Sequence, residues 1–131
     1  MAPLPEHIKE LIDRPVFAHV ATVGPTGHPQ NTVMWIDRDG DLLVLNTAAG
    51  RAKWHNMRDD PRLSISISPE DAPYVNYSLK CRVVEMRTSD GDEVIDRLAH
   101  KYLGVDEYPY RRPDETRVTI LAEVLSVAGN R

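Results

Sequence analysis

Six short runs of β-type residues, joined mostly by tight turns, constrain the fold of this chain more than any other feature. They span residues 16–23, 29–37, 42–45, 63–68, 74–87 and 118–127. The turns between them include Gly24-Pro25-Thr26-Gly27 and Asp39-Gly40, whose glycines tolerate the positive φ angles of hairpins. Strands joined by hairpins pair antiparallel and need no long crossover connections. The pattern therefore predicts a small antiparallel barrel, closed or nearly closed.

Three helical segments are expected outside the strands. Residues 5–13 carry apolar side chains at helical spacing, and Pro15 ends that segment. Residues 89–104 begin with acidic residues and end at a glycine, which is typical of a capped helix. A short third segment follows the run at 42–45 and stops before Pro61. Since the chain has 131 residues, we expect a single domain over residues 1–131, mainly β with flanking helices.

The runs differ in the burial that their patterns predict. Residues 42–45 are apolar without alternation, so we expect them to be buried on both faces of the sheet. Residues 63–68 alternate strictly between apolar residues and serine, which indicates a strand with one buried face. Residues 74–87 exceed the usual length of a strand, and this predicts a long strand, with a bulge as one way to form it.

Charge and composition argue against several classes of function. A formal net charge of −4 and a pI near 5.7 disfavour non-specific binding to nucleic acids or anionic membranes. No apolar run approaches the ~20 residues of a membrane span, and the N-terminus lacks a signal-peptide pattern, so we expect a cytoplasmic protein. The five histidines are scattered without metal-ligand spacing, so no metal site is predicted. Cys81 lies between Lys80 and Arg82, which would lower a thiol pKa, but an inert strand cysteine is the default interpretation.

The strongest chemical signal is a pair of cations, Arg51 and Lys53, at the start of the short helix. The first turn of a helix normally carries acidic residues, because its free N–H groups and the helix dipole are positive. Two cations there add positive charge to a positive potential, which is unfavourable. A bound phosphate would offset this repulsion, so the two cations and the helix start could form a binding site. A solvated basic helix face explains the same residues equally well.

Aromatic residues accompany this pair of cations. Trp35 and Trp54 flank it in sequence, and each suits either stacking on a planar ring or packing in the core. Tyr108 and Tyr110 precede two arginines in a combination that resembles a nucleic-acid patch. Because the whole chain is acidic, a loop that folds over a ligand or a neighbouring subunit is the better interpretation.

Three stretches of the sequence match a known pattern. Residues 27–35 read GHPQNTVMW, residues 45–53 read LNTAAGRAK, and residues 56–62 read NMRDDPR. They resemble the pyridoxamine 5′-phosphate oxidase-like split-barrel flavoproteins, over residues 16–127. Residues 96–104 and 108–118 are most similar to the reductases of that family that use coenzyme F420, a deazaflavin.

The resemblance implies an antiparallel six-stranded split β-barrel of the FMN-binding type. It also implies a homodimer, in which two barrels pack together with the cofactor in a groove at their interface. By the same resemblance, Arg51 and Lys53 hold the cofactor phosphate, Asn46 and Thr47 approach the ribityl chain or ring, and the ring lies beside residues of the second run, namely Gln30, Asn31, Thr32 and Trp35. The chain departs from the family pattern at Val33, where relatives often have proline, and at Cys81, where they often have glycine.

The function implied by this resemblance is transfer of a hydride from reduced F420 to a small conjugated acceptor. An FMN-dependent oxidoreductase of the same fold is the main alternative, since both cofactors combine a tricyclic ring with a phosphate-bearing arm. A non-catalytic cofactor carrier, or a structural dimer with an empty groove, is a further alternative. No side chain is assigned as a catalytic acid, because the cofactor carries most of the chemistry. The substrate cannot be read from loops that follow no general code.

Overall fold

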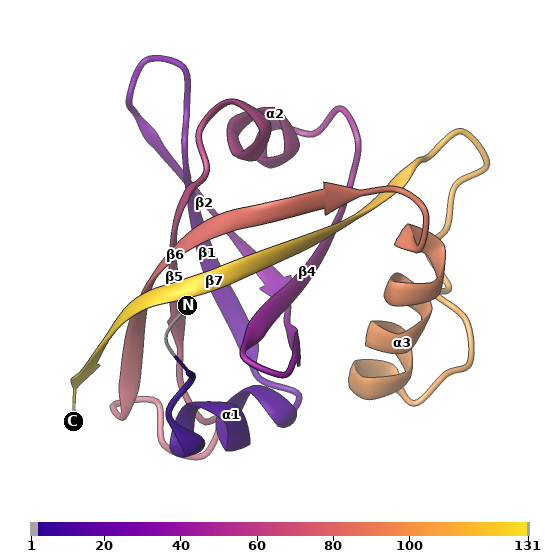
Figure 1. The fold of residues 1–131 in the computed structure, drawn as a ribbon. Coiled ribbons are helices and arrows are strands. Elements are labelled where there is room, and N and C mark those ends of the chain that lie inside the picture. The colour runs from indigo at the N-terminus through magenta and orange to yellow at the C-terminus, as the bar shows by residue number, and fades with distance from the viewer. Residues whose placement is uncertain (1–2, 131) are drawn as a thin grey trace.

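The computed structural model describes residues 3–130, with three helices and seven strands (Figure 1). The helices are α1 (Glu6–Asp13), α2 (Ala52–Asp59) and α3 (Gly91–Leu103). The strands are β1 (Phe17–Val23), β2 (Pro29–Trp35), β3 (Asp37–Asp39), β4 (Leu42–Ala48), β5 (Arg62–Ile67), β6 (Asn76–Arg87) and β7 (Arg117–Asn130). No helix within this described range is long and apolar enough to span a bilayer.

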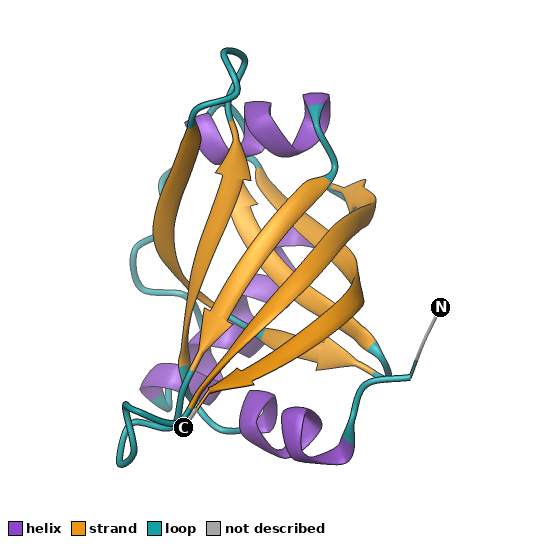
Figure 2. Cartoon of the chain, turned by 90° about the vertical axis from the view of Figure 1, so that its left-hand side faces the viewer, coloured by secondary structure: helices purple, strands orange, loops and turns teal. Residues whose placement is uncertain are grey.

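The seven strands form one antiparallel sheet in the order β2-β1-β5-β6-β7-β4-β3. Its two edge strands, β2 and β3, are consecutive in the chain and are separated only by Ile36. The sheet must therefore curl until its edges meet at this residue, and Figure 2 shows the strands wrapped in this way with α1 and α2 at opposite ends. The mainly β, antiparallel split barrel with flanking helices is confirmed.

The structure has one strand more than the six expected from the sequence. Residues 37–39, which the sequence places in a hairpin turn, instead pair with residues 42–44 as strand β3. The turn itself shrinks to two residues, and Gly40 takes a φ of +61° there. Arg38 then binds the Asp13 carboxylate through Nε at 2.8 Å and Nη2 at 2.9 Å, which ties β3 to the end of α1. Backbone pairing thus outweighs the low β-propensity of the two aspartates in this short strand.

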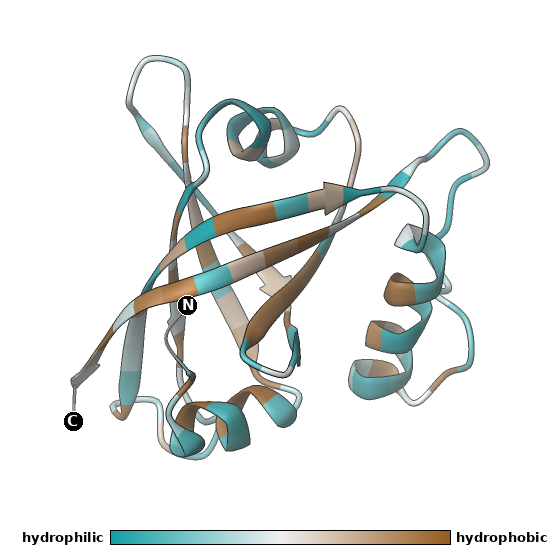
Figure 3. Ribbon diagram, viewed as in Figure 1, coloured by the Kyte–Doolittle hydropathy of each residue, from teal (hydrophilic) through white to brown (hydrophobic). Residues whose placement is uncertain are grey.

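Strand β4 is buried on both faces, as its unbroken apolar run predicts. Leu43 and Leu45 point into the barrel, where they join the main hydrophobic core. Val44, on the opposite face, packs against the apolar side of α3, which contributes Val94, Ile95 and Leu98. Figure 3 shows β4 as hydrophobic, and Figure 1 places α3 outside the barrel wall. The helix therefore has a fixed position beside the sheet.

Strand β6 runs for twelve residues, from Asn76 to Arg87. Its register against β7 shifts between Lys80 and Cys81 and again between Val83 and Glu85. Such register shifts agree with the bulge that the length of the run at 74–87 suggests. Cys81 lies next to the first of them, 2% exposed in the core, and burial raises the pKa of its thiol to about 12. The flanking cations therefore do not activate this cysteine, and it stays protonated at neutral pH.

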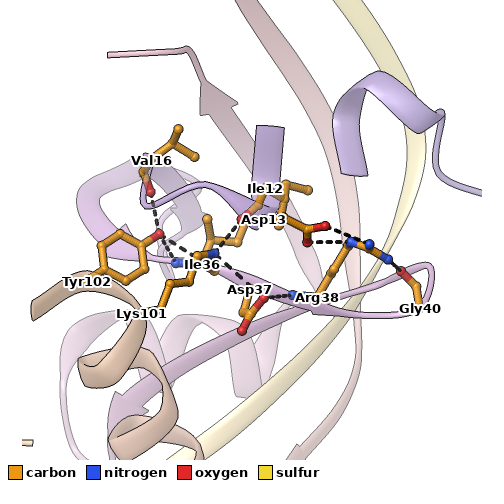
Figure 4. A network of polar contacts seen from close by, with 9 residues as sticks. All are labelled: Ile12, Asp13, Val16, Ile36, Asp37, Arg38, Gly40, Lys101 and Tyr102. Atoms are coloured by element: carbon orange, nitrogen blue, oxygen red, sulfur yellow. Dashed lines mark hydrogen bonds and ion pairs between the residues drawn. The ribbon is translucent and has the colours of Figure 1, made fainter. Parts of the chain in front are cut away.

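Two side chains from the end of α3 fasten the junction between β2 and β3 (Figure 4). The Tyr102 hydroxyl accepts the N–H of Ile36 at 2.9 Å and lies within hydrogen-bond distance of the carbonyls of Val16 and Ile36. The Lys101 ammonium donates to the carbonyls of Ile12 and Ile36, the latter at 2.6 Å. Since an edge of the sheet leaves backbone groups unpaired, these contacts satisfy groups that the strands do not.

Replacing Tyr102 with phenylalanine should lower the free energy of unfolding by about 1–3 kcal/mol, because the substitution leaves buried backbone groups without a partner. Denaturant unfolding at constant m-value would measure this. Tyr74→Phe is the matched control, since Tyr74 is 84% exposed and should change stability by less than ~0.5 kcal/mol. Equal stability of the two variants would show that the hydroxyl does not fasten the junction.

Candidate functional site

A groove of about 210 Å³ opens between the barrel and α3. Its apolar lining comes from β1, β2, α3 and the loop that follows α3, namely Phe17, Val33, Met34, Trp35, Ile95, Leu98, Tyr108 and Tyr110. Its polar lining comes from β4, from the start of α2 and from the start of β7, namely Asn46, Arg51, Lys53 and Arg117. One groove therefore combines aromatic side chains with three cations.

The two cations singled out in the sequence lie at the start of α2. Gly50 takes a φ of +94° between β4 and the helix, Arg51 is the N-cap residue, and Lys53 follows within the first turn, which has no acidic residue. Arg51 Nη2 is 3.5 Å from Glu115 Oε2, whereas Lys53 makes no ion pair with any described residue. Burial, reinforced by Arg51 and Arg117, lowers the pKa of Lys53. A bound anion would offset this repulsion.

Arg117, at the start of β7, is the cation that sequence reasoning missed. It is only 5% exposed. Its Nε donates to Asn46 Oδ1 at 2.9 Å, and its Nη1 lies 3.0 Å from Glu115 Oε1. The Asn46 amide in turn donates to the carbonyl of Gly91 at 2.9 Å. Asn46 thus lines the groove, but its amide group is engaged with the protein itself.

The aromatic part of the groove is built around Trp35. Its ring is stacked on Tyr102 at 5.2 Å and 12°, and Tyr108 meets it edge-on at 6.0 Å. Tyr110 packs against Tyr108 at 5.6 Å. Trp54, in contrast, packs against the main core and carries Arg58 over its ring at 4.5 Å. Of the two tryptophans in the sequence, only Trp35 therefore reaches the groove.

The loop that carries Tyr108 and Tyr110 is anchored to α3. The backbone N–H of Tyr108 donates to Asp96 at 2.8 Å, and Arg111 pairs with Asp96 and with Asp92, the latter at 2.8 Å. Arg111 is thus engaged with carboxylates and is not part of an open basic patch. The sequence favoured a loop that folds over a ligand or a subunit, and this loop forms one wall of the groove.

The structure brings together four of the eight binding residues expected from the resemblance: Trp35, Asn46, Arg51 and Lys53. The others lie outside the groove lining. Gln30 accepts a hydrogen bond from Thr22 at 3.3 Å, and the buried hydroxyls of Thr32 and Thr47 have no partner within residues 3–130. Asn31 is exposed and alternates onto the face of β2 that carries Val33 and Trp35.

The comparisons with known proteins agree with this geometry. The sequence profile described as pyridoxamine 5′-phosphate oxidase matches residues 4–129. The chain belongs to this family. A search of curated protein sequences gave no significant match.

Solved structures of this fold include proteins of several descriptions. An F420 reductase is 27% identical, with a TM-score of 0.83 over 95% of this chain and 98% of its own. A pyridoxamine 5′-phosphate oxidase-related FMN binding protein from Nostoc punctiforme is 15% identical, with a TM-score of 0.69 over 98% and 84%. HupZ from Group A Streptococcus is 18% identical, with a TM-score of 0.69 over 96% and 93%. The fold thus accommodates both FMN- and F420-related proteins.

Proposed function

We propose that this protein is an F420-dependent reductase that passes a hydride from the reduced deazaflavin to a small conjugated acceptor. The observation that carries the proposal is one groove lined by both cations and aromatic side chains, in a chain that aligns over 95% of its length with an F420 reductase. The resemblance of residues 96–104 and 108–118 to the F420-dependent members of the family supports the choice of cofactor.

The groove residues fit a cofactor that has a flat ring and an anionic arm. Lys53 has an ammonium without a partner in the described chain, and Arg51 is held by a single 3.5 Å contact, so both have donors left for an anion. Trp35, Tyr108 and the aliphatic side chains offer apolar surface to a ring system. A bound deazaflavin or flavin would supply the hydride chemistry.

The protein's own residues would bind, orient and shield the ring. Arg51 and Lys53 would fix the arm, and α3 and the loop with Tyr108 would exclude water from one side of the ring. The part of the chain described contributes no carboxyl or imidazole group to the groove lining. We therefore expect the proton that accompanies the hydride to come from solvent, and no residue is assigned as a catalytic acid.

The first test is a parallel titration of the cofactor-free protein with F420 and FMN, followed by tryptophan fluorescence because Trp35 lies in the groove. We expect F420 to bind more tightly, and reduced F420 to support reduction of quinone, enone or pyrrole-type acceptors. FMN that copurifies stoichiometrically, without detectable affinity for F420, would favour the FMN-dependent oxidoreductase. Tight binding without turnover of any acceptor would favour a cofactor carrier.

We also propose that the protein is a homodimer with two cofactor sites, each formed in part by the interface. Three apolar side chains at the groove are largely exposed in the single chain: Phe17 at 56%, Val33 at 55% and Tyr110 at 65%. Contiguous apolar surface of this kind is typical of an interface. A second copy related by a two-fold axis would cover it and complete the groove.

Dilution should separate the subunits and release the cofactor together, because ligand and partner stabilise each other by mass action. Sedimentation velocity over a range of protein concentrations, with and without F420, measures both effects. The cofactor should lower the dissociation constant of the dimer. A monomer that binds cofactor with undiminished affinity would rule out a site at the interface.

A further inference from the structure

Arg117 is a buried cation in the wall of the groove. Only 4% of its side chain is exposed. Arg117 nevertheless lines the groove, so a group bound there can come close to this side chain. A buried charge is costly unless its donors are satisfied, so its partners show what the position is built for.

The protein satisfies only part of this guanidinium. Nε donates to Asn46 and Nη1 to Glu115, whereas Nη2 donates to no atom within residues 3–130. The Tyr108 ring covers one side of the guanidinium, with its centre 5.2 Å from Cζ. Arginine has five N–H donors, so donors on Nη2 remain for a group that enters the groove.

The charges around Arg117 do not balance. Glu115 is the one carboxylate in this part of the described chain that pairs with these cations, and it is shared between Arg117 at 3.0 Å and Arg51 at 3.5 Å. Lys53 has no carboxylate partner in the described chain. The groove therefore holds two positive charges that the described residues leave uncompensated, and this matches a doubly charged anion.

The position of Arg117 is also fixed in advance of binding. Its backbone pairs with Ala48 at the end of β4, and the neighbouring Thr116 carbonyl accepts the N–H of Ala49 at 2.9 Å. On the other side, a Cβ atom added to Gly91 would lie 2.0 Å from the Arg117 carbonyl oxygen, so α3 packs directly against this backbone. A donor held in this way loses little entropy when it binds.

We propose that Arg117 is a third anion-binding residue and that the groove recognises a doubly charged arm, such as a phosphate monoester or a phosphate next to a carboxylate. This inference rests on the proposed function, since it assigns the arm of the cofactor that the groove would hold. In this arrangement Asn46 is a positioning residue, because it holds Arg117 Nε and does not need to touch the ligand.

The test compares ligands with and without the charged arm. FMN is paired with riboflavin, and F420 with the deazaflavin that lacks its phosphate. Arg117→Lys keeps the charge but loses the planar guanidinium with its paired N–H donors. It should therefore weaken the binding of FMN or F420 roughly tenfold. The dissociation constants of the ligands without the charged arm should change by less than about twofold. Arg87→Lys is the control, because Arg87 pairs with Glu85 and Asp90 outside the groove. This variant should bind both ligands of each pair with unchanged affinity.

Two results would overturn the inference, and a third would separate it from the proposed function. Equal weakening of the armed and arm-free ligands would mean that Arg117 only shapes the groove. If Arg117→Lys does not fold, the side-chain Nε–Hε NMR signal of Arg117 in the native protein is followed instead. It should shift with FMN or F420 but not with riboflavin, and a signal that FMN and F420 leave unmoved would overturn the inference. If the native protein binds no flavin or deazaflavin, the proposed function fails. In that case a titration with inorganic phosphate that leaves the Arg117 signal unmoved would reject the anion site as well.

Discussion

Replacing both Arg51 and Lys53 with alanine is expected to weaken cofactor binding by about 2–4 kcal/mol, which is roughly 30- to 1,000-fold in the dissociation constant. Each residue supplies a charge-assisted contact worth about 1.5–3 kcal/mol, and neighbouring contacts are not fully additive. The fold should survive, since Lys53 has no ion-pair partner among the described residues and Glu115 keeps its contact with Arg117. Titration calorimetry with F420 and with FMN measures the change.

The matched control is the double variant Arg58→Ala, Arg62→Ala, which removes the same number of charges from α2 and the residues that follow it. Neither arginine lines the groove. If the loss in the first variant came from net charge alone, the control would reproduce it. An unchanged dissociation constant in Arg51→Ala, Lys53→Ala would show that the phosphate is held elsewhere.

The largest effect on stability is expected at Gly91, the first residue of α3. Helix propensity alone predicts that Gly91→Ala stabilises the helix by about 0.5–1 kcal/mol. The structure predicts the opposite sign, because the new Cβ would lie 2.0 Å from the Arg117 carbonyl oxygen and 2.5 Å from its carbonyl carbon. Backbone atoms cannot yield as a flexible side chain does, so we expect a loss of about 3 kcal/mol.

Thermal unfolding should show this loss as a fall of roughly 10 °C in melting temperature. Gly27→Ala is the control, since Gly27 has a φ of +84° and open space around it, and it should cost only about 1 kcal/mol. The Gly91→Ala variant should also bind FMN or F420 more weakly, because displacement of α3 disturbs the hydrogen bond from the Asn46 amide to the Gly91 carbonyl. A variant at Gly91 that is as stable as the native protein would contradict the packing described.

Local patterns in the sequence determined most of the secondary structure. The alternation of residues 63–68, the unbroken apolar run at 42–45 and the excess length of the run at 74–87 each predicted a strand that the structure contains. The alternation at 63–68 is informative because side chains point to opposite faces of a strand in turn, so neighbouring positions show which face is buried. Residues 37–39 were missed because their aspartates and the following glycine are typical of a turn, and a strand of only three residues is too short to show a pattern of its own.

The residues of the groove likewise fall into two groups: those with a signal in the local sequence and those that only the fold brings together. Arg51 and Lys53 stand out in the sequence because their cost is local, two cations at a helix start, and Trp35 was found through the family pattern. Arg117 and Glu115 carry no such signal. Arg117 meets Asn46 across 71 positions of chain, and only the pairing of β4 with β7 brings them together. The sequence by itself determined six of the seven strands and the pair of cations. Only the tertiary structure decided that a third, buried cation joins them, because charge balance in a groove depends on contacts between residues far apart in the chain.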